Sequence, residues 1–106
     1  MNAAEPELRK LVELELEAAN REYPPFHSAH EGYAVILEEA DEAQAELEAL
    51  LAWVRALWKD IKMNADKARS FSEGIEHRAI RLAAEALQVA AMARKFRQLG
   101  GGYDEL

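Results

Sequence analysis

Apolar residues recur through the centre of this chain at a spacing that a long α-helix satisfies. They stand three and four residues apart in alternation over about four heptads, with no proline among them. Ser28 is placed to cap this helix, with Glu31 as its capping-box partner three residues later. The pattern predicts one helix from Ser28 to about Lys62, the longest element of the chain. Its apolar stripe consists of Tyr33, Ile36, Ala40, Ala43, Leu47, Leu50, Val54, Leu57 and Ile61.

A shorter helix is predicted before the long one. Pro6 suits the first turn of a helix, because the N–H group that proline lacks has no helical partner there. The helix is expected to continue to about Asn20, and the Tyr23–Pro25 segment ends it because neither proline can extend a helix. Residues 1–26 are therefore expected to form a peripheral N-terminal helix with a proline break.

A third helix is predicted after a reversal at Met63–Asp66, where Asn and Asp favour a turn. It begins at that turn or at Ser70 or Ser72, which open a second capping-box pattern. A flexible acidic tail is expected over residues 98–106. The helix carries small residues on nearly every face, which predicts that other helices pack closely on both sides of it. These small residues are Ala83, Ala84, Ala86, Ala90, Ala91 and Ala93.

The sequence contains no strand pattern, internal repeat or linker. Its 106 residues suit one domain with one modest core. We therefore predict an all-α fold in a single helical domain over residues 1–106. Because three helices leave a long apolar seam partly uncovered, we expect a helical bundle completed by dimerisation, as a homodimer or a dimer of dimers.

Composition limits the function classes. The net charge of −7 argues against a nucleic-acid or anionic-membrane binder, since both need a basic surface. With no cysteine, the chain has no disulfide, thiolate metal site or Cys nucleophile. No run approaches the roughly 20 apolar residues of a membrane span, and the N-terminus lacks the apolar core of a signal peptide. A cytoplasmic location is expected.

Three acids, Glu39, Glu42 and Glu46, fall on one edge of the long helix, directly beside the apolar stripe. Like charges at this spacing repel one another, more strongly as burial lowers the dielectric. Such a row is either solvated or holds a cation.

The last helix carries a matching polar pair, Glu85 and Gln88, on an edge shared with Arg81 and Met92. If the two long helices pack antiparallel, the two edges can converge and offer several oxygens to a hard cation. Magnesium takes about six oxygens from carboxylates, water and phosphates. A divalent metal site is therefore one reading of the two edges, and a solubilising acidic surface is the other.

These residues resemble the MazG-like all-α nucleoside triphosphate pyrophosphohydrolases, whose pattern is E-x-x-E on one helix and E-x-x-D on a later one. Glu39 and Glu42 match the first pair, with Glu38 in front as in the family's frequent double glutamate. Glu85 matches the start of the second pair, and Gln88 stands where the family has aspartate. The resemblance spans roughly residues 27 to 97 and is closest to a small phage and bacterial branch. That branch carries the strings found here at His30–Ile36 and Gln88–Ala93.

The resemblance implies cleavage of a (deoxy)nucleoside triphosphate to a monophosphate and pyrophosphate, with Mg²⁺, or alternatively Mn²⁺, as cofactor. It implies Glu38 and Glu39 as catalytic residues. The implied metal ligands are Glu39, Glu42, Glu85 and Gln88. Residues that would contact phosphates are Arg81, Arg94, Lys95 or Arg97, and Tyr33 or Trp53 would face the base.

Two departures from the family pattern support a second hypothesis, a catalytically weak or inactive relative that binds nucleotides or acts as a helical interaction module. Gln88 gives a metal one charge fewer than aspartate would. The interval from Glu42 to Glu85 is also longer than usual, through an extension in the Leu47–Lys62 segment.

Several residues have structural readings that we favour. His27 and His30 have the spacing of a metal pair but suit a helix start. Trp53 and Trp58 are expected to pack in a core or dimer interface rather than stack on a base. The cations Arg94 and Lys95 lie in the last turns of a helix, where the helix dipole favours them without a ligand.

Overall fold

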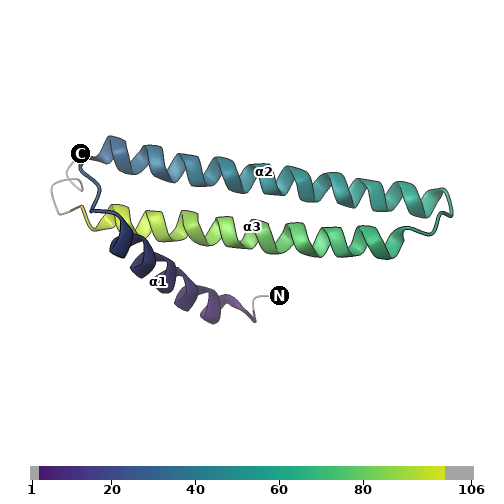
Figure 1. Ribbon diagram of the computed structural model, residues 1–106, viewed down its shortest axis with the longest axis horizontal. Coiled ribbons are helices and arrows are strands. Elements are labelled where there is room, and N and C mark those ends of the chain that lie inside the picture. Colours follow the sequence, from purple (N-terminus) through teal and green to yellow (C-terminus); the bar gives the residue numbers. More distant parts are fainter. Residues whose placement is uncertain (1–2, 100–106) are drawn as a thin grey trace. The chain divides into compact units, whose positions relative to one another are not determined.

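A computed structural model describes residues 3–99 and folds them into three α-helices, α1 (Glu5–Glu22), α2 (Ala29–Lys62) and α3 (Ala68–Arg97) (Figure 1). The predicted all-α class is confirmed, and no strand occurs within residues 3–99. The predicted tail lies mostly outside the described residues. None of the helices in the described range is both long enough and apolar enough to cross a membrane.

The first two helices have the boundaries that their sequence signals predict. Pro6 lies in the first turn of α1, and Tyr23 ends the helix in an extended conformation with φ −128°. The Oγ of Ser28 accepts a hydrogen bond from the Glu31 N–H at 3.1 Å, which caps α2. The Glu31 carboxylate accepts from the N–H of His27, one residue before the capping-box position.

The connection between α2 and α3 is a tight turn over residues 63–67. Asn64 adopts a left-handed conformation with φ 51°, which asparagine tolerates better than most residues. Asp60, in the last turn of α2, accepts a hydrogen bond from the Lys67 N–H at 3.2 Å and so caps the start of α3. The helix thus begins at Ala68, and neither Ser70 nor Ser72 starts it.

The contacts divide the chain into two compact units, to both of which α2 and α3 contribute. Unit 1 comprises Met1–Ala40 and Ala86–Leu106, of which residues 3–40 and 86–99 are described, and unit 2 comprises Asp41–Glu85. Each unit is described below by itself.

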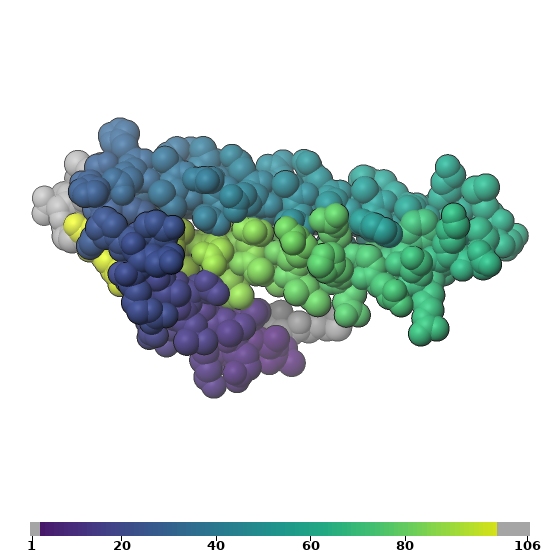
Figure 2. Space-filling view, viewed as in Figure 1, coloured from purple at the N-terminus to yellow at the C-terminus, as the bar shows by residue number. Residues whose placement is uncertain are grey.

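Unit 1 holds the buried core, to which α1 contributes directly. Val12 of α1 packs with Phe26, Ala91 and Met92, and partly buried neighbours such as Val35 surround them. Figure 1 shows α1 crossing the C-terminal part of α3 obliquely, and in Figure 2 the atoms of α1 lie directly against it. A Cβ on Gly32 would lie 2.5 Å from the Phe96 ring, so glycine at this position lets the ring pack against the α2 backbone.

Unit 2 is an antiparallel pair made from the later part of α2 and the first part of α3. The Trp53 ring meets the Phe71 ring edge-on, with 5.7 Å between centroids and an interplanar angle of 64°. A Cβ on Gly74 would lie 2.7 Å from Trp53 Cε3, so Trp53 lies directly on the α3 backbone.

The small residues of α3 are not uniformly covered. Ala91 is fully buried, whereas the side chains of Ala83, Ala84, Ala86 and Ala90 are exposed in the single chain. Among the described residues, the small side chains of α3 are therefore most closely covered near Ala91.

Candidate metal centre and cavity

In unit 2 two of the predicted metal ligands come together, one from each helix. Carboxylate oxygens of Glu42 on α2 and Glu85 on α3 lie within 4.8 Å of each other. Burial raises the pKa of Glu85, and the hydrogen bond and the negative charge of Glu42 raise it further. A hydrogen bond between two carboxyl groups requires one of them to keep a proton. A cation between Glu42 and Glu85 would therefore be stabilised by both side chains.

Glu39 extends this acidic set along α2. It is half-buried and stands one helical turn before Glu42 on the same helix. The E-x-x-E pair of the sequence is thus a pair of neighbouring carboxylates on one helix edge.

The third acid of the predicted row, Glu46, differs from the other two. Arg81 donates a hydrogen bond from Nε to Glu46 at 2.9 Å, and an Arg78 guanidinium nitrogen lies 3.6 Å from the same carboxylate. The hydrogen bond from Arg81 lowers the pKa of Glu46, which fixes it in the charged form. Arg81, a predicted phosphate contact, is therefore part of an ion pair between α2 and α3 in unit 2.

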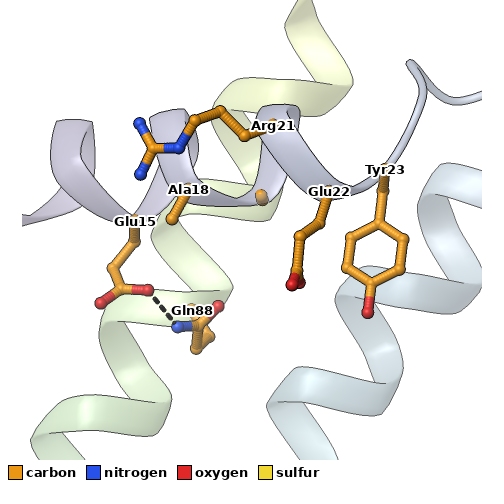
Figure 3. Close-up of a pocket in the computed structure, with 7 residues that line it drawn as sticks. Glu15, Ala18, Arg21, Glu22, Tyr23 and Gln88 are labelled. Atoms are coloured by element: carbon orange, nitrogen blue, oxygen red, sulfur yellow. Dashed lines mark hydrogen bonds between the residues drawn. The ribbon is translucent and has the colours of Figure 1, made fainter.

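Gln88 lies in unit 1 and has its own partner. Its side-chain amide donates a hydrogen bond to the Glu15 carboxylate of α1 (Figure 3). The two residues share a surface pocket of about 400 Å³ with Arg21, Glu22 and Tyr23. The resemblance implies Gln88 as a metal ligand. In the structure its side-chain amide connects α3 to α1 through the hydrogen bond to Glu15.

A second cavity of unit 1, of about 410 Å³, contains four of the predicted site residues: Glu38, Glu39, Gln88 and Lys95. Glu31 adds another acid, and the rest of the lining is mainly apolar and aromatic. These lining residues are Ala19, Tyr23, Pro24, Phe26, Val35 and Met92.

Lys95 is the least expected member of this cavity lining. Only 4% of it is exposed, and its Nζ lies 4.9 Å from the centroid of the Phe26 ring, a cation–π distance. The charge of a lysine with so little exposure is stabilised by the protein groups around it rather than by water. It places a positive charge beside the acids of the cavity.

The other predicted contacts are distributed elsewhere. A guanidinium nitrogen of Arg94 lies 3.7 Å from a carboxylate oxygen of Glu13 on α1. Tyr33 is 63% exposed and lines a shallow pocket with His30 and Phe96. Trp53 packs on Phe71 within unit 2, as the structural reading of the tryptophans expects.

The two histidines near the start of α2 have different surroundings. His27 Nδ1 lies 2.9 Å from a Glu31 oxygen, and that hydrogen bond is the main cause that lowers the pKa of Glu31. His30 instead lines the shallow pocket beside Tyr33.

Sequence reasoning missed Glu31, Tyr23 and Phe26 as parts of the cavity. One signal was present, because Lys95 follows Ala91 by four residues and Met92 by three, on the apolar face of the last helix. A charge at such a position indicates a partner within the core. The proline pair before Phe26 gives no comparable indication that Phe26 lines the cavity.

Comparison with models of known families, with curated protein sequences and with solved structures finds no match to this chain. The resemblance to the MazG-like class therefore depends on the motifs alone.

Proposed function

We propose that this protein is a Mg²⁺-dependent nucleotide pyrophosphohydrolase of the MazG-like class, with Mn²⁺ as an alternative cofactor. The observation that carries the proposal is the meeting of Glu42 and Glu85 in unit 2, with a raised pKa for Glu85. The two acids come from different helices, as in the paired acidic motifs of the family that the chain resembles, although their separation of 43 residues is longer than the usual interval of that family.

The donor set fits a hard divalent cation. A cation between Glu42 and Glu85 would remove the repulsion between the two carboxylates. The resemblance implies Glu39, one turn earlier on α2, as a further ligand. Magnesium commonly uses only a few carboxylates and completes its shell with water and substrate phosphates. Gln88 is not needed for such a site.

When bound, the metal would supply charge neutralisation for the phosphates and a more acidic water molecule. In the reaction, water adds to the α-phosphorus, the bond to the bridging oxygen breaks, and pyrophosphate leaves. The resemblance implies that Glu38 and Glu39 accept the proton that this water loses. Taken by itself, the cavity of unit 1 offers the positive charge of Lys95 and the aromatic surface of Tyr23 and Phe26.

The direct test is pyrophosphate release from a panel of nucleoside and deoxynucleoside triphosphates with Mg²⁺ or Mn²⁺. We expect Glu42→Gln to reduce turnover about 100-fold, in the range typical for loss of one essential charged group. Asp41→Asn is the matched control, since it changes an exposed neighbouring acid and is expected to leave turnover unchanged. Absence of pyrophosphate release from every triphosphate would contradict the proposal.

A second candidate function is a catalytically weak or inactive relative that binds nucleotides or acts as a helical interaction module. The hydrogen bond from Gln88 to Glu15 favours it, because that amide has a structural partner instead of a metal. Gln88→Asp alone would place two acids together, so Glu15→Gln/Gln88→Asp is the informative variant. An enzyme should gain turnover or Mg²⁺ affinity from this change, whereas a binding module should gain neither.

We also propose that the protein is a homodimer or homotetramer located in the cytoplasm. Large apolar side chains are exposed in the single chain, among them Leu14, Trp58 and Ile80. Among the described residues no large side chain is fully buried. Pairing with further copies would bury part of this surface.

A further inference from the structure

The apolar stripe that the sequence predicts on α2 divides into two in unit 2. Leu50 and Leu57 are half-buried, on the edge of α2 that carries Trp53 and faces α3. Leu47, Val54 and Ile61 are 42%, 42% and 50% exposed. Half of the stripe therefore packs inside the unit, and the other half is open to solvent.

The open half forms a regular second stripe, which we call the outer stripe. Leu51 and Trp58 complete it, at 39% and 57% exposure. The steps between its members are four, three, four and three residues, the spacing of the a and d positions of a coiled coil. A row of five large apolar side chains at this spacing is unlike the scattered apolar residues of an ordinary surface. The outer stripe is Leu47, Leu51, Val54, Trp58 and Ile61.

Charged residues beside the outer stripe indicate what covers it. Glu48, Arg55 and Lys62 follow one another at seven-residue intervals along its edge, and all three are exposed. The row is negative at its start and positive afterwards. When two identical helices pair antiparallel, Glu48 of one copy meets Arg55 or Lys62 of the other, and symmetry makes this contact twice.

A parallel pair would lack these contacts. In a parallel coiled coil this edge faces the opposite flanking row of the other helix. That row is Leu50 and Leu57, which carry no charge and already belong to the inside of unit 2.

We propose that the outer stripe of α2 is an antiparallel helix–helix interface with a second copy of this chain. The inference rests on the homo-oligomer part of the proposed function and not on catalysis. The outer stripe lies in the Leu47–Lys62 segment, the extension by which this chain departs from the pattern of the family that it resembles. The resemblance therefore does not imply this interface.

The first test measures the oligomeric state of the full chain by sedimentation velocity and light scattering. We expect the wild type to self-associate and Val54→Glu to weaken association roughly 100-fold or more, because it buries an unpaired charge. Ala52→Glu is the control, since Ala52 is exposed on the same helix away from the outer stripe. Circular dichroism establishes that both variants remain helical. A monomeric wild type, or equal association of the two variants, would overturn the proposal.

The charged row gives an independent readout. Glu48→Arg is expected to weaken association about 5-fold or more, and so is the double variant Arg55→Glu/Lys62→Glu. Mixing these two proteins should restore association, because each then meets its complement. If the mixture associates no better than either protein alone, the charge pairing is wrong.

Helix direction can be tested with cysteines, because the chain has none of its own. A disulfide needs Cα atoms within about 7 Å. Ile61→Cys should not cross-link with itself in an antiparallel pair. It should cross-link with Leu51→Cys, or Leu47→Cys should cross-link with Trp58→Cys, according to the alignment of the helices. Efficient self-linking of Ile61→Cys, or no cross-link in either mixture, would overturn the antiparallel arrangement. Activity plays no part in these measurements, so an inactive protein that dimerises through this face refutes only the enzymatic proposal.

Discussion

At the scale of single residues, two acids of unit 2 show how partners decide the behaviour of a carboxylate. Glu46 is held by Arg81 and Arg78, and its pKa is lowered. The pKa of Glu85 is raised, first by burial and then by Glu42. The like-charged row of α2 therefore contains one acid neutralised by arginines, Glu46, and one acid, Glu42, that lies beside a further carboxylate, Glu85 of α3.

Glu85 gives a prediction for stability against pH. Since its folded-state pKa lies above the ordinary value of 4.5, the folded state binds the proton more tightly than the unfolded state. This residue's contribution to stability is therefore fully present below pH 4.5 and is lost as pH rises through the raised pKa. Glu85→Gln should raise the melting temperature at pH 7.5 in metal-free buffer.

The same variant should change little at pH 4, where the Glu85 carboxyl is already protonated. Glu76→Gln on the exposed face of α3 is the control and should behave like the wild type at both pH values. A Glu85→Gln variant that is less stable than the wild type at pH 7.5 would show that the carboxylate is not under the repulsion described.

Gly74 gives a second prediction at this scale. Alanine is favoured over glycine in a helix by about 1 kcal/mol, but its Cβ would overlap the Trp53 ring. Overpacking of this kind costs about 1–3 kcal/mol. Gly74→Ala should therefore lower the free energy of unfolding by about 1 kcal/mol in a urea titration, whereas Ser72→Ala, at an exposed position, should not. Trp53→Leu should make Gly74→Ala less harmful, and an additive double variant would contradict the overlap.

At the scale of elements, the junction between α2 and α3 depends on Asp60. This residue is 6% exposed, and its Oδ1 accepts the Lys67 N–H at 3.2 Å. Loss of an N-terminal cap typically costs about 1–2 kcal/mol. Asp60→Ala should therefore destabilise the fold by that amount and speed hydrogen exchange at the Lys67 amide.

Asp60→Asn is the matched variant, because it keeps an oxygen at the Oδ1 position. It should retain most of the protection at Lys67. If both variants exchange as slowly as the wild type, the cap does not depend on this side chain.

The sequence predicts the helices well because their signals are local. The apolar spacing, Ser28 and the proline pair place α2 and the end of α1 within about two residues. The start of α3 could not be placed in this way, because its cap comes from Asp60, seven residues earlier, across a turn. A local sequence pattern cannot predict a hydrogen-bond partner on the other side of a turn.

The same reason explains what the sequence could and could not predict about the site. Motif spacing predicts that Glu42 and Glu85 converge, and the antiparallel pair in unit 2 brings them together. Periodicity cannot predict that Gln88 bonds Glu15, since the position of α1 depends on packing around Val12. Periodicity also predicts which residues of α2 form the apolar stripe, but not which half of the stripe faces α3. The contact of Trp53 with Gly74 shows which half does.

At the scale of the whole molecule, the negative charge of the chain bears on the substrate that we propose. A net charge of −7 opposes direct binding of polyphosphates, and a divalent cation at the acidic pair would reverse that local repulsion. Cation binding should also stabilise the folded state by mass action. In the proposed function, binding, stability and catalysis would therefore all depend on the metal.

The most direct measurement is a calorimetric titration of Mn²⁺ into the full chain at pH 7.5. We predict one saturable site in the wild type and in Asp41→Asn. The site should be lost in Glu42→Gln and in Glu85→Gln. Absence of binding to the wild type, or equal binding to all four proteins, would contradict the claim that these two acids hold a cation.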